Sequence, residues 1–178
     1  MVNRLMKKSD LKKHIRDIPD FPKEGIIFKD ITTLLKDKDA FKKSVELLAK
    51  KFKKEKIDFV VGVEARGFIF GATLAYKLNA GFIPVRKKGK LPSKTKSVTY
   101  ELEYGTDVLE MHEDALSQGS RVLIVDDLLA TGGTIQAVIE LVESQKAAIA
   151  GVAFLVELKF LKGINKLKDL PVYSVIKY

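Results

Sequence analysis

The sequence of 178 residues has no cysteine and only two histidines, His14 and His112. Without cysteine the chain cannot form disulfides, thiolate nucleophiles, iron–sulfur clusters or cysteine-bound zinc, and two imidazoles argue against a structural zinc site. A chain without thiols is well suited to a reducing compartment. These absences exclude thiol chemistry and favour a cytoplasmic protein.

Long hydrophobic runs are missing as well. The longest uninterrupted one in the second half, from Ala147 to Val156, has ten residues, about half of the roughly 20 that a membrane-spanning helix needs. The N-terminal lysines precede no apolar segment of the kind found in a secretory signal. No Pro-, Gly- or Ser-rich linker divides the chain. With 46% hydrophobic residues, we expect one domain over 1–178 with a sizeable core and no membrane partner.

Acidic residues are scarce outside one segment. The formal net charge is +9, yet residues 101–157 hold two basic and eleven acidic residues, so the positive excess lies elsewhere. A basic balance makes nucleic acid or a polyphosphate ligand the first partners to consider. Lysine runs such as Lys50 to Lys56 are more often a solvated helix face than a binding surface.

Residues 57–178 alternate short apolar runs with helical patterns, which is typical of a parallel sheet built from βαβ units. Two alternating runs beside Gly105 predict a β-hairpin. The first 35 residues form a small N-terminal hood, in which Ser9 caps a short helix and 18–25 is an ordered loop. The fold class is therefore α/β, a parallel sheet flanked by helices, with a hood at 1–35 and a core at 57–178. Strands are expected at 57–63, 82–85, 97–102, 107–111, 121–125, 148–157 and 172–176, and helices at 39–52, 69–78 and 134–143.

The strongest motif is Val122-Leu-Ile-Val-Asp-Asp-Leu-Leu-Ala-Thr-Gly-Gly-Thr134, a buried strand that ends in two acids and leads through a small-residue turn into a helix. Glycines let the backbone approach an anion, and the helix start adds hydroxyls and N–H groups, so Thr131, Gly132, Gly133 and Thr134 predict a monophosphate cradle. Asp126 and Asp127 suit two sugar hydroxyls. Taken alone, the acids could cap a helix and the glycines could make an ordinary turn.

Together these parts resemble the motif that binds 5-phosphoribosyl 1-diphosphate (PRPP) in type I phosphoribosyltransferases, and the resemblance covers the whole chain. It assigns to PRPP binding the residues Asp126, Asp127, Ala130, Thr131, Gly132, Gly133 and Thr134. The run Val61-Gly-Val-Glu-Ala-Arg-Gly67 is similar to the family's pyrophosphate loop. There the resemblance assigns Glu64, Ala65, Arg66 and Gly67 to PRPP, gives Arg66 a catalytic role, and implies a cis peptide between Glu64 and Ala65.

Two further segments carry the catalytic assignments that the resemblance implies. Val85-Arg-Lys-Lys-Gly-Lys-Leu-Pro-Ser93 is similar to the flexible catalytic loop, in which Arg86 and Lys90 would reach the departing pyrophosphate. Glu101-Leu-Glu-Tyr-Gly105 matches the hairpin that carries the catalytic glutamate. That residue would be Glu103, which handles the proton of the base.

The base-reading segment resembles that of the adenine-specific members of the family. In Asp20-Phe-Pro-Lys-Glu-Gly-Ile-Ile-Phe-Lys-Asp-Ile-Thr32, backbone groups at Ile27 would pair with the purine edge. Phe28 and Leu128 would stack on the purine faces, and Lys29 and Tyr104 complete the expected adenine contacts. Lys29 stands where many relatives have arginine, which puts any bidentate contact there in doubt. Ala130 favours adenine over 6-oxopurines, because enzymes for hypoxanthine and guanine usually carry an acid there.

The resemblance therefore implies transfer of the 5-phosphoribosyl group from PRPP to adenine, giving AMP and pyrophosphate in purine salvage. It also implies Mg²⁺ held mainly by PRPP and pyrophosphate, a homodimer, and no nucleic-acid partner. Two alternatives stay open. One is a regulator that senses PRPP and binds nucleic acid through its basic surface, although no helix-turn-helix precedes the domain. The other is a phosphoribosyltransferase for another base.

Overall fold

The computed structural model describes residues 6–101, 105–167 and 169–178. The chain divides into two compact units, Met1–Leu47 and Leu48–Tyr178. No helix in the described part of the chain is long and apolar enough to cross a membrane.

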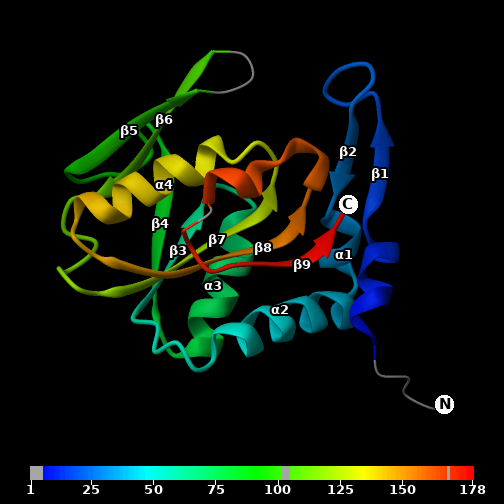
Figure 1. Cartoon of the computed structure of the whole chain (residues 1–178), viewed down its shortest axis with the longest axis horizontal. Coiled ribbons are helices and arrows are strands. Elements are labelled where there is room, and N and C mark those ends of the chain that lie inside the picture. The colour runs from blue at the N-terminus through cyan, green and yellow to red at the C-terminus, as the bar shows by residue number, and fades with distance from the viewer. Residues whose placement is uncertain (1–5, 102–104, 168) are drawn as a thin grey trace. The chain divides into compact units, whose positions relative to one another are not determined.

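The second unit is built on a seven-stranded sheet in the order β5-β6-β4-β3-β7-β8-β9 (Figure 1). The neighbouring strands β4, β3, β7, β8 and β9 pair in parallel. Strand β6 pairs antiparallel with both β4 and β5. The predicted α/β class and the hairpin are confirmed, and the hairpin extends the sheet itself. The strands are β3 (Phe59–Val63), β4 (Gly81–Lys87), β5 (Thr95–Glu101), β6 (Thr106–His112), β7 (Arg121–Leu129), β8 (Ala148–Glu157) and β9 (Val172–Lys177).

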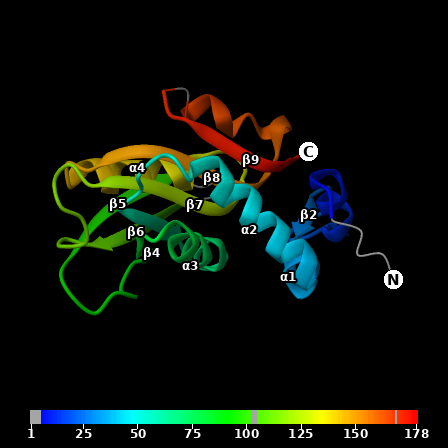
Figure 2. The ribbon, with the colours of Figure 1, turned by 90° about the horizontal axis from the view of Figure 1, so that it is seen from below.

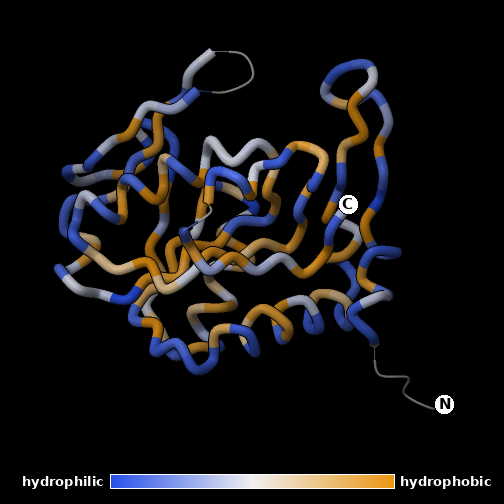
Figure 3. The backbone as a smooth tube through the Cα atoms, in the orientation of Figure 1, coloured by the Kyte–Doolittle hydropathy of each residue, from blue (hydrophilic) through white to orange (hydrophobic). Residues whose placement is uncertain are grey.

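Helices cover both faces of this sheet. Helix α3 (Gly67–Leu78) follows β3, helix α4 (Gly133–Ser144) follows β7, and the two lie on opposite faces (Figure 2). Right-handed crossovers that run outward in both directions from neighbouring strands place their helices in this way. The central strands are therefore apolar along their length (Figure 3), and Val122 to Val125 are fully buried, as expected for a sheet covered on both sides.

Strand β7 is longer than the predicted strand 121–125. It continues to Leu129 because Asp126 and Leu128 still pair with Phe154 and Val156 of β8. The acid pair thus lies inside the strand rather than after its end. Short 3₁₀ helices, η2 (Lys159–Leu161) and η3 (Gly163–Leu167), connect β8 to the edge strand β9.

The first unit contains a hairpin that the sequence did not predict, since only an ordered loop was expected at 18–25. Its strands β1 (Arg16–Pro19) and β2 (Ile27–Asp30) pair antiparallel, and Asp20 Oδ1 accepts a hydrogen bond of 2.8 Å from the Gly25 amide at the tip. The 3₁₀ helix η1 (Lys8–His14) precedes them, and α1 (Thr32–Lys36) and α2 (Lys38–Phe52) follow. The predicted capping role of Ser9 is wrong, because η1 begins at Lys8 and Ser9 lies inside it. The residue before the helix is Lys7, whose amide donates a hydrogen bond to Asp10 Oδ2.

Candidate functional site

A cavity of about 270 Å³ opens where β3 and β7 end, at the carboxyl edge of the parallel strands. Ligands of open α/β sheets bind beyond this edge, because the loops that leave the strands gather there. The lining residues come from the end of β3 and the loop after it, from β4, β5, β6 and β7, and from the turn after β7 and the start of α4. They are Val63, Glu64, Ala65, Arg66, Lys87, Tyr100, Leu109, Asp126, Asp127, Leu128, Ala130 and Thr134.

The loop between β3 and α3 brings Arg66 to the acid pair. The peptide between Glu64 and Ala65 is cis, as expected. Arg66 Nε lies 2.9 Å from Asp127 Oδ2. A Cβ on Gly67 would come within 2.8 Å of Asp126 Oδ1, so glycine at this position lets the start of α3 approach the acids closely.

The two acids occupy different environments on β7. Asp127 is 5% exposed and faces Arg66, whereas Asp126 is half-buried and its Oδ1 accepts a hydrogen bond of 2.8 Å from the Asp127 amide. Burial raises the pKa of Asp126, and the neighbouring charge of Asp127 raises it further. Burial also raises the pKa of Asp127, although the Arg66 guanidinium opposes that shift. Such a pair favours hydroxyl donors or a cation beside it.

The turn after β7 presents backbone N–H groups. We call residues Ala130 to Gly133 the phosphate turn. Gly132 adopts φ +85°, which glycine tolerates, and α4 begins at Gly133 without a side-chain cap. The first N–H groups of a helix have no intrahelical partner, so they are available to an anion. Glu101 of β5 backs this turn, since its carbonyl oxygen would lie 3.1 Å from a Cβ on Gly133.

Arg86 is bound to Glu64 in this structure. Its Nε and Nη2 donate to the two Glu64 oxygens at 3.1 and 3.2 Å, and Nη1 donates to the Lys90 carbonyl at 3.1 Å. The Lys87 amide donates to Glu64 as well. The Arg86 guanidinium and this amide lower the pKa of Glu64. Glu64 therefore contacts an arginine and, like Arg66 and the acid pair, lines the cavity.

Two polar residues of the cavity, Lys87 and Tyr100, were missed in the sequence. Lys87 forms an ion pair of 2.9 Å with Asp107, which raises the pKa of Lys87 and lowers that of Asp107. Tyr100 lines the cavity together with Thr134, and burial raises the pKa of Tyr100. The alternation along 97–102 was the available signal for Tyr100. Glu103 and Tyr104, predicted to act on the base, lie outside the described residues.

The predicted base-reading residues of the first unit lie on β2, and Leu128 lies on β7 of the second unit. Ile27 is 54% exposed, and Phe28 packs edge-on against Phe21 with ring centroids 5.2 Å apart. Lys29 is buried and forms an ion pair of 2.7 Å with Asp17 across the hairpin.

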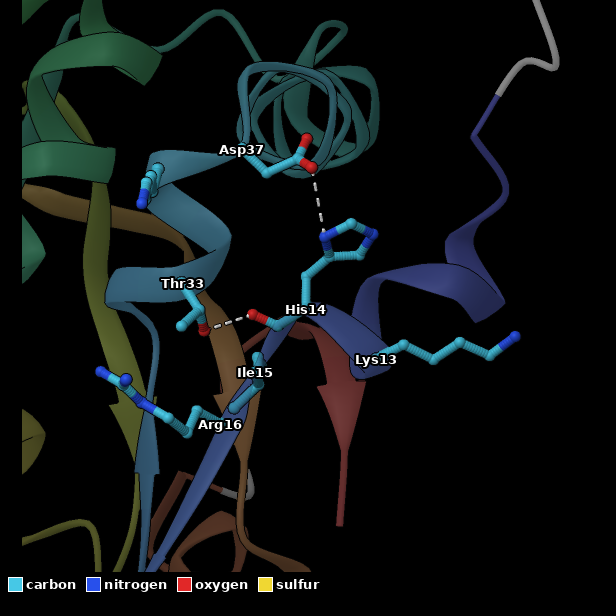
Figure 4. Close-up of a pocket in the computed structure, with 7 residues that line it drawn as sticks. Lys13, His14, Ile15, Arg16, Thr33 and Asp37 are labelled. Atoms are coloured by element: carbon cyan, nitrogen blue, oxygen red, sulfur yellow. Dashed lines mark hydrogen bonds and ion pairs between the residues drawn. The ribbon is translucent and has the colours of Figure 1, made fainter.

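The first unit also has a hollow of about 420 Å³ whose cations do not converge (Figure 4). His14 points to Asp37, 3.5 Å away, while Lys13 and Arg16 point away from each other. Arg16 is held by Asp30, with its Nη2 2.6 Å from Oδ2. The hollow therefore offers no focused anion site.

Comparison with known proteins agrees with this geometry. The model of the phosphoribosyl transferase domain matches residues 30–175, and the chain belongs to that family. Relatives at 58–60% identity are named adenine phosphoribosyltransferase. The one from Brachyspira hyodysenteriae is 58% identical over 169 residues, which are 95% of this chain and 99% of that protein.

Solved structures give the same result. The adenine phosphoribosyltransferase of Thermoanaerobacter pseudethanolicus superimposes with a TM-score of 0.94 at 56% identity, covering 97% of this chain and all of that one. The Saccharomyces cerevisiae enzyme, solved with an imino-altritol bisphosphate and adenine, has a TM-score of 0.89 at 44% identity and covers 94% of this chain and 97% of that one.

Proposed function

We propose that this protein transfers the 5-phosphoribosyl group of PRPP to adenine, forming AMP and releasing pyrophosphate. The main support for this proposal is that the loop with Arg66, the acid pair on β7 and the phosphate turn all border one cavity. Those three parts match the three polar regions of PRPP, which are its diphosphate, its ribose hydroxyls and its 5-phosphate. The reaction belongs to purine salvage.

Each part of PRPP has a complementary partner. The N–H groups of the phosphate turn and the start of α4 bind the 5-phosphate. Asp126 and Asp127 accept hydrogen bonds from the ribose hydroxyls. Residues Glu64 to Gly67 bind the diphosphate, with Arg66 exchanging the Asp127 carboxylate for a phosphate oxygen.

Magnesium fits the site as a companion of the substrate. Within the described ranges, no three His, Cys, Asp or Glu side chains gather as a metal site. The carboxylates of Asp126 and Asp127 are therefore the protein groups that would hold the ion or its waters, with PRPP supplying the other oxygens. When bound, Mg²⁺ would neutralise charge on the leaving diphosphate.

The chemical step is a displacement at the anomeric carbon. The protein aligns base and sugar and stabilises the departing pyrophosphate with Arg66, Arg86 and Lys90. Arg86 would leave Glu64 to do so. Glu103 manages the proton of adenine. The base contacts of Ile27, Phe28, Lys29, Leu128 and Tyr104 remain predictions, as does the preference that Ala130 gives for adenine.

A cytoplasmic homodimer belongs to the same proposal. Helix α3 exposes Ile69 by 36% and Tyr76 by 86%, and large apolar groups on one helix face favour self-association. Light scattering tests this. We expect a dimer for the wild-type protein and a larger monomer fraction for Tyr76→Arg. A wild-type protein with the same monomer fraction as Tyr76→Arg would contradict the proposal.

The function is tested by measuring AMP formation from adenine and PRPP with and without Mg²⁺, beside hypoxanthine, guanine and xanthine. Adenine-selective, metal-dependent turnover is expected. Turnover with another base would overturn the base assignment alone. Binding of PRPP without turnover on any base would favour a regulator that senses PRPP. Such a regulator would be identified by binding to a nucleic-acid duplex that weakens steeply as the salt concentration rises.

A further inference from the structure

Helix η3 begins with a glycine that touches the phosphate turn backbone to backbone. A Cβ on Gly163 would overlap the Ala130 carbonyl oxygen, and it would come within 3.0 Å of both the Thr131 carbonyl carbon and the Gly132 nitrogen. In the other direction, a Cβ on Gly132 would lie 2.9 Å from the Gly163 oxygen. Neither residue therefore has room for a side chain.

The segment that carries Gly163 is fixed on both sides. Leu167, at the end of η3, is 2% exposed and belongs to the core cluster. Before η2, the Leu158 amide donates to the Leu129 carbonyl at 2.9 Å, which joins this segment to the end of β7. The Lys159 amide donates to the Tyr178 carbonyl at 3.0 Å. Gly163 thus rests on a braced support rather than on a loose loop.

The atoms that a side chain at 163 would meet belong to the backbone of the turn. A flexible side chain could rotate away from an added methyl group, but a backbone carbonyl and amide move only if the turn itself moves. The turn directs several N–H groups at one point. A misplacement of about 1 Å in a site of this kind can lower the rate of an enzymatic reaction roughly 10²-fold.

We propose that Gly163 is a positioning residue for the 5-phosphate of PRPP. Its backbone buttresses residues Ala130 to Gly133 from behind and so fixes the N–H groups that bind the phosphate. The inference rests on the proposed function, because that function assigns the 5-phosphate to this turn. It predicts that Gly163→Ala weakens binding of ribose 5-phosphate while leaving pyrophosphate, bound at the Arg66 loop, nearly unaffected.

Calorimetric titration of the full chain with ribose 5-phosphate and, separately, with pyrophosphate and Mg²⁺ tests the proposal. For Gly163→Ala we expect at least a tenfold rise in the Kd of ribose 5-phosphate and less than a twofold change for pyrophosphate. Gly151→Ala is the matched control. Its Cβ would meet a Phe52 ring carbon at 2.6 Å, at the other end of β8, so it should lower the Tm and change neither Kd.

Unchanged ribose 5-phosphate binding in Gly163→Ala, or an equal loss of both ligands, would overturn the proposal. If the variant does not fold, hydrogen exchange of the wild-type protein gives the answer. Ribose 5-phosphate should protect 158–167 together with 130–136, and protection of the turn without 158–167 would refute the buttress.

These binding measurements are independent of the reaction. A wild-type protein that binds ribose 5-phosphate but forms no AMP would end the proposed function and leave the buttress to be judged by the variant. A wild-type protein that forms AMP, with a Gly163→Ala variant that binds ribose 5-phosphate normally, would end the inference alone. Failure of the wild-type protein to bind ribose 5-phosphate would overturn the inference, and the proposed function would still be judged by AMP formation alone.

Discussion

Replacing Arg66 with alanine tests the site through its effect on both stability and rate. The guanidinium Nε lies 2.9 Å from Asp127 Oδ2, and Asp127 is 5% exposed. Stranding a buried charge costs about 3–5 kcal/mol. Because burial already raises the Asp127 pKa, we expect this carboxyl to take up a proton instead. The loss should then be about 1–3 kcal/mol, as for a buried polar group without a partner.

The sign of the pH dependence follows from the same shift. Without Arg66 the folded-state pKa of Asp127 rises further above its unfolded value of 3.8. A raised pKa gives stability that is present below the unfolded value and lost as pH rises through the folded one. Urea denaturation should therefore show a stability deficit of Arg66→Ala at pH 7 that shrinks as pH falls toward the unfolded value of 3.8 and is smallest below it.

The catalytic effect is separate from the structural one. Loss of one electrostatic donor at the leaving group should lower kcat/KM about 10²–10³-fold, which is roughly 2.7–4 kcal/mol of transition-state stabilisation. Arg66→Lys keeps the charge without the planar fork, so its kcat/KM should fall between those of the wild-type protein and Arg66→Ala. Combining Arg66→Ala with Asp127→Asn should destabilise less than the sum of the single changes, because the two side chains are partners.

Two results would refute this reasoning. A kcat/KM of Arg66→Ala within threefold of the wild-type value would remove Arg66 from the catalytic machinery. Strictly additive losses of stability in the double variant would show that Arg66 and Asp127 are not coupled in solution.

Three further predictions concern other residues. Glu103→Gln should lower kcat about 10²–10³-fold with little change in the KM of PRPP, and near-normal turnover would exclude Glu103. Ala130→Asp should shift the kcat/KM ratio of adenine to hypoxanthine toward hypoxanthine by roughly tenfold or more, whereas an unchanged ratio would separate Ala130 from base choice. The Thr32 amide and Arg16 lower the pKa of Asp30 from 3.8 to about 2, so Asp30→Asn should cost about 1–2 kcal/mol at pH 7, discounted because Arg16 is partly exposed. In urea denaturation, the stability deficit of Asp30→Asn should vanish as pH falls toward 2. The control variant Glu46→Gln should show no deficit. A deficit of Asp30→Asn that persists at pH 2 would contradict the lowered pKa of Asp30.

The sequence predicted the parts of the fold whose signals are local. The run Val122 to Val125, followed by two acids and two glycines, specifies strand, turn and helix within a dozen residues. The strand boundary was wrong by four residues because pairing with β8, rather than the polarity of Asp126, decides where β7 ends. The hairpin of the first unit was missed because Pro19 and the polar tip hide its short strands.

The remaining features depend on contacts between distant segments. Nothing near Arg86 in the sequence indicates that it binds Glu64, which is 22 residues away. Tyr100 and Lys87 enter the cavity because β6 joins β4 and β5 in one particular register. The requirement for glycine at 163 arises from the phosphate turn about 30 residues earlier, so its local sequence carries no sign of it.

The contacts in this structure also explain why acids stand in a site for a polyanion. Arg66 is held by Asp127, Arg86 by Glu64 and Lys87 by Asp107. In the proposed reaction the diphosphate replaces the Asp127 carboxylate at Arg66, and the freed Asp127 accepts ribose hydroxyls together with Asp126. At Arg66 and Asp127, donors and acceptors are exchanged one for one, so neither side chain is left without a partner when PRPP enters. A phosphate ion without the sugar could engage the arginine but could not satisfy the acids. By this argument the acid pair selects PRPP over simpler polyanions.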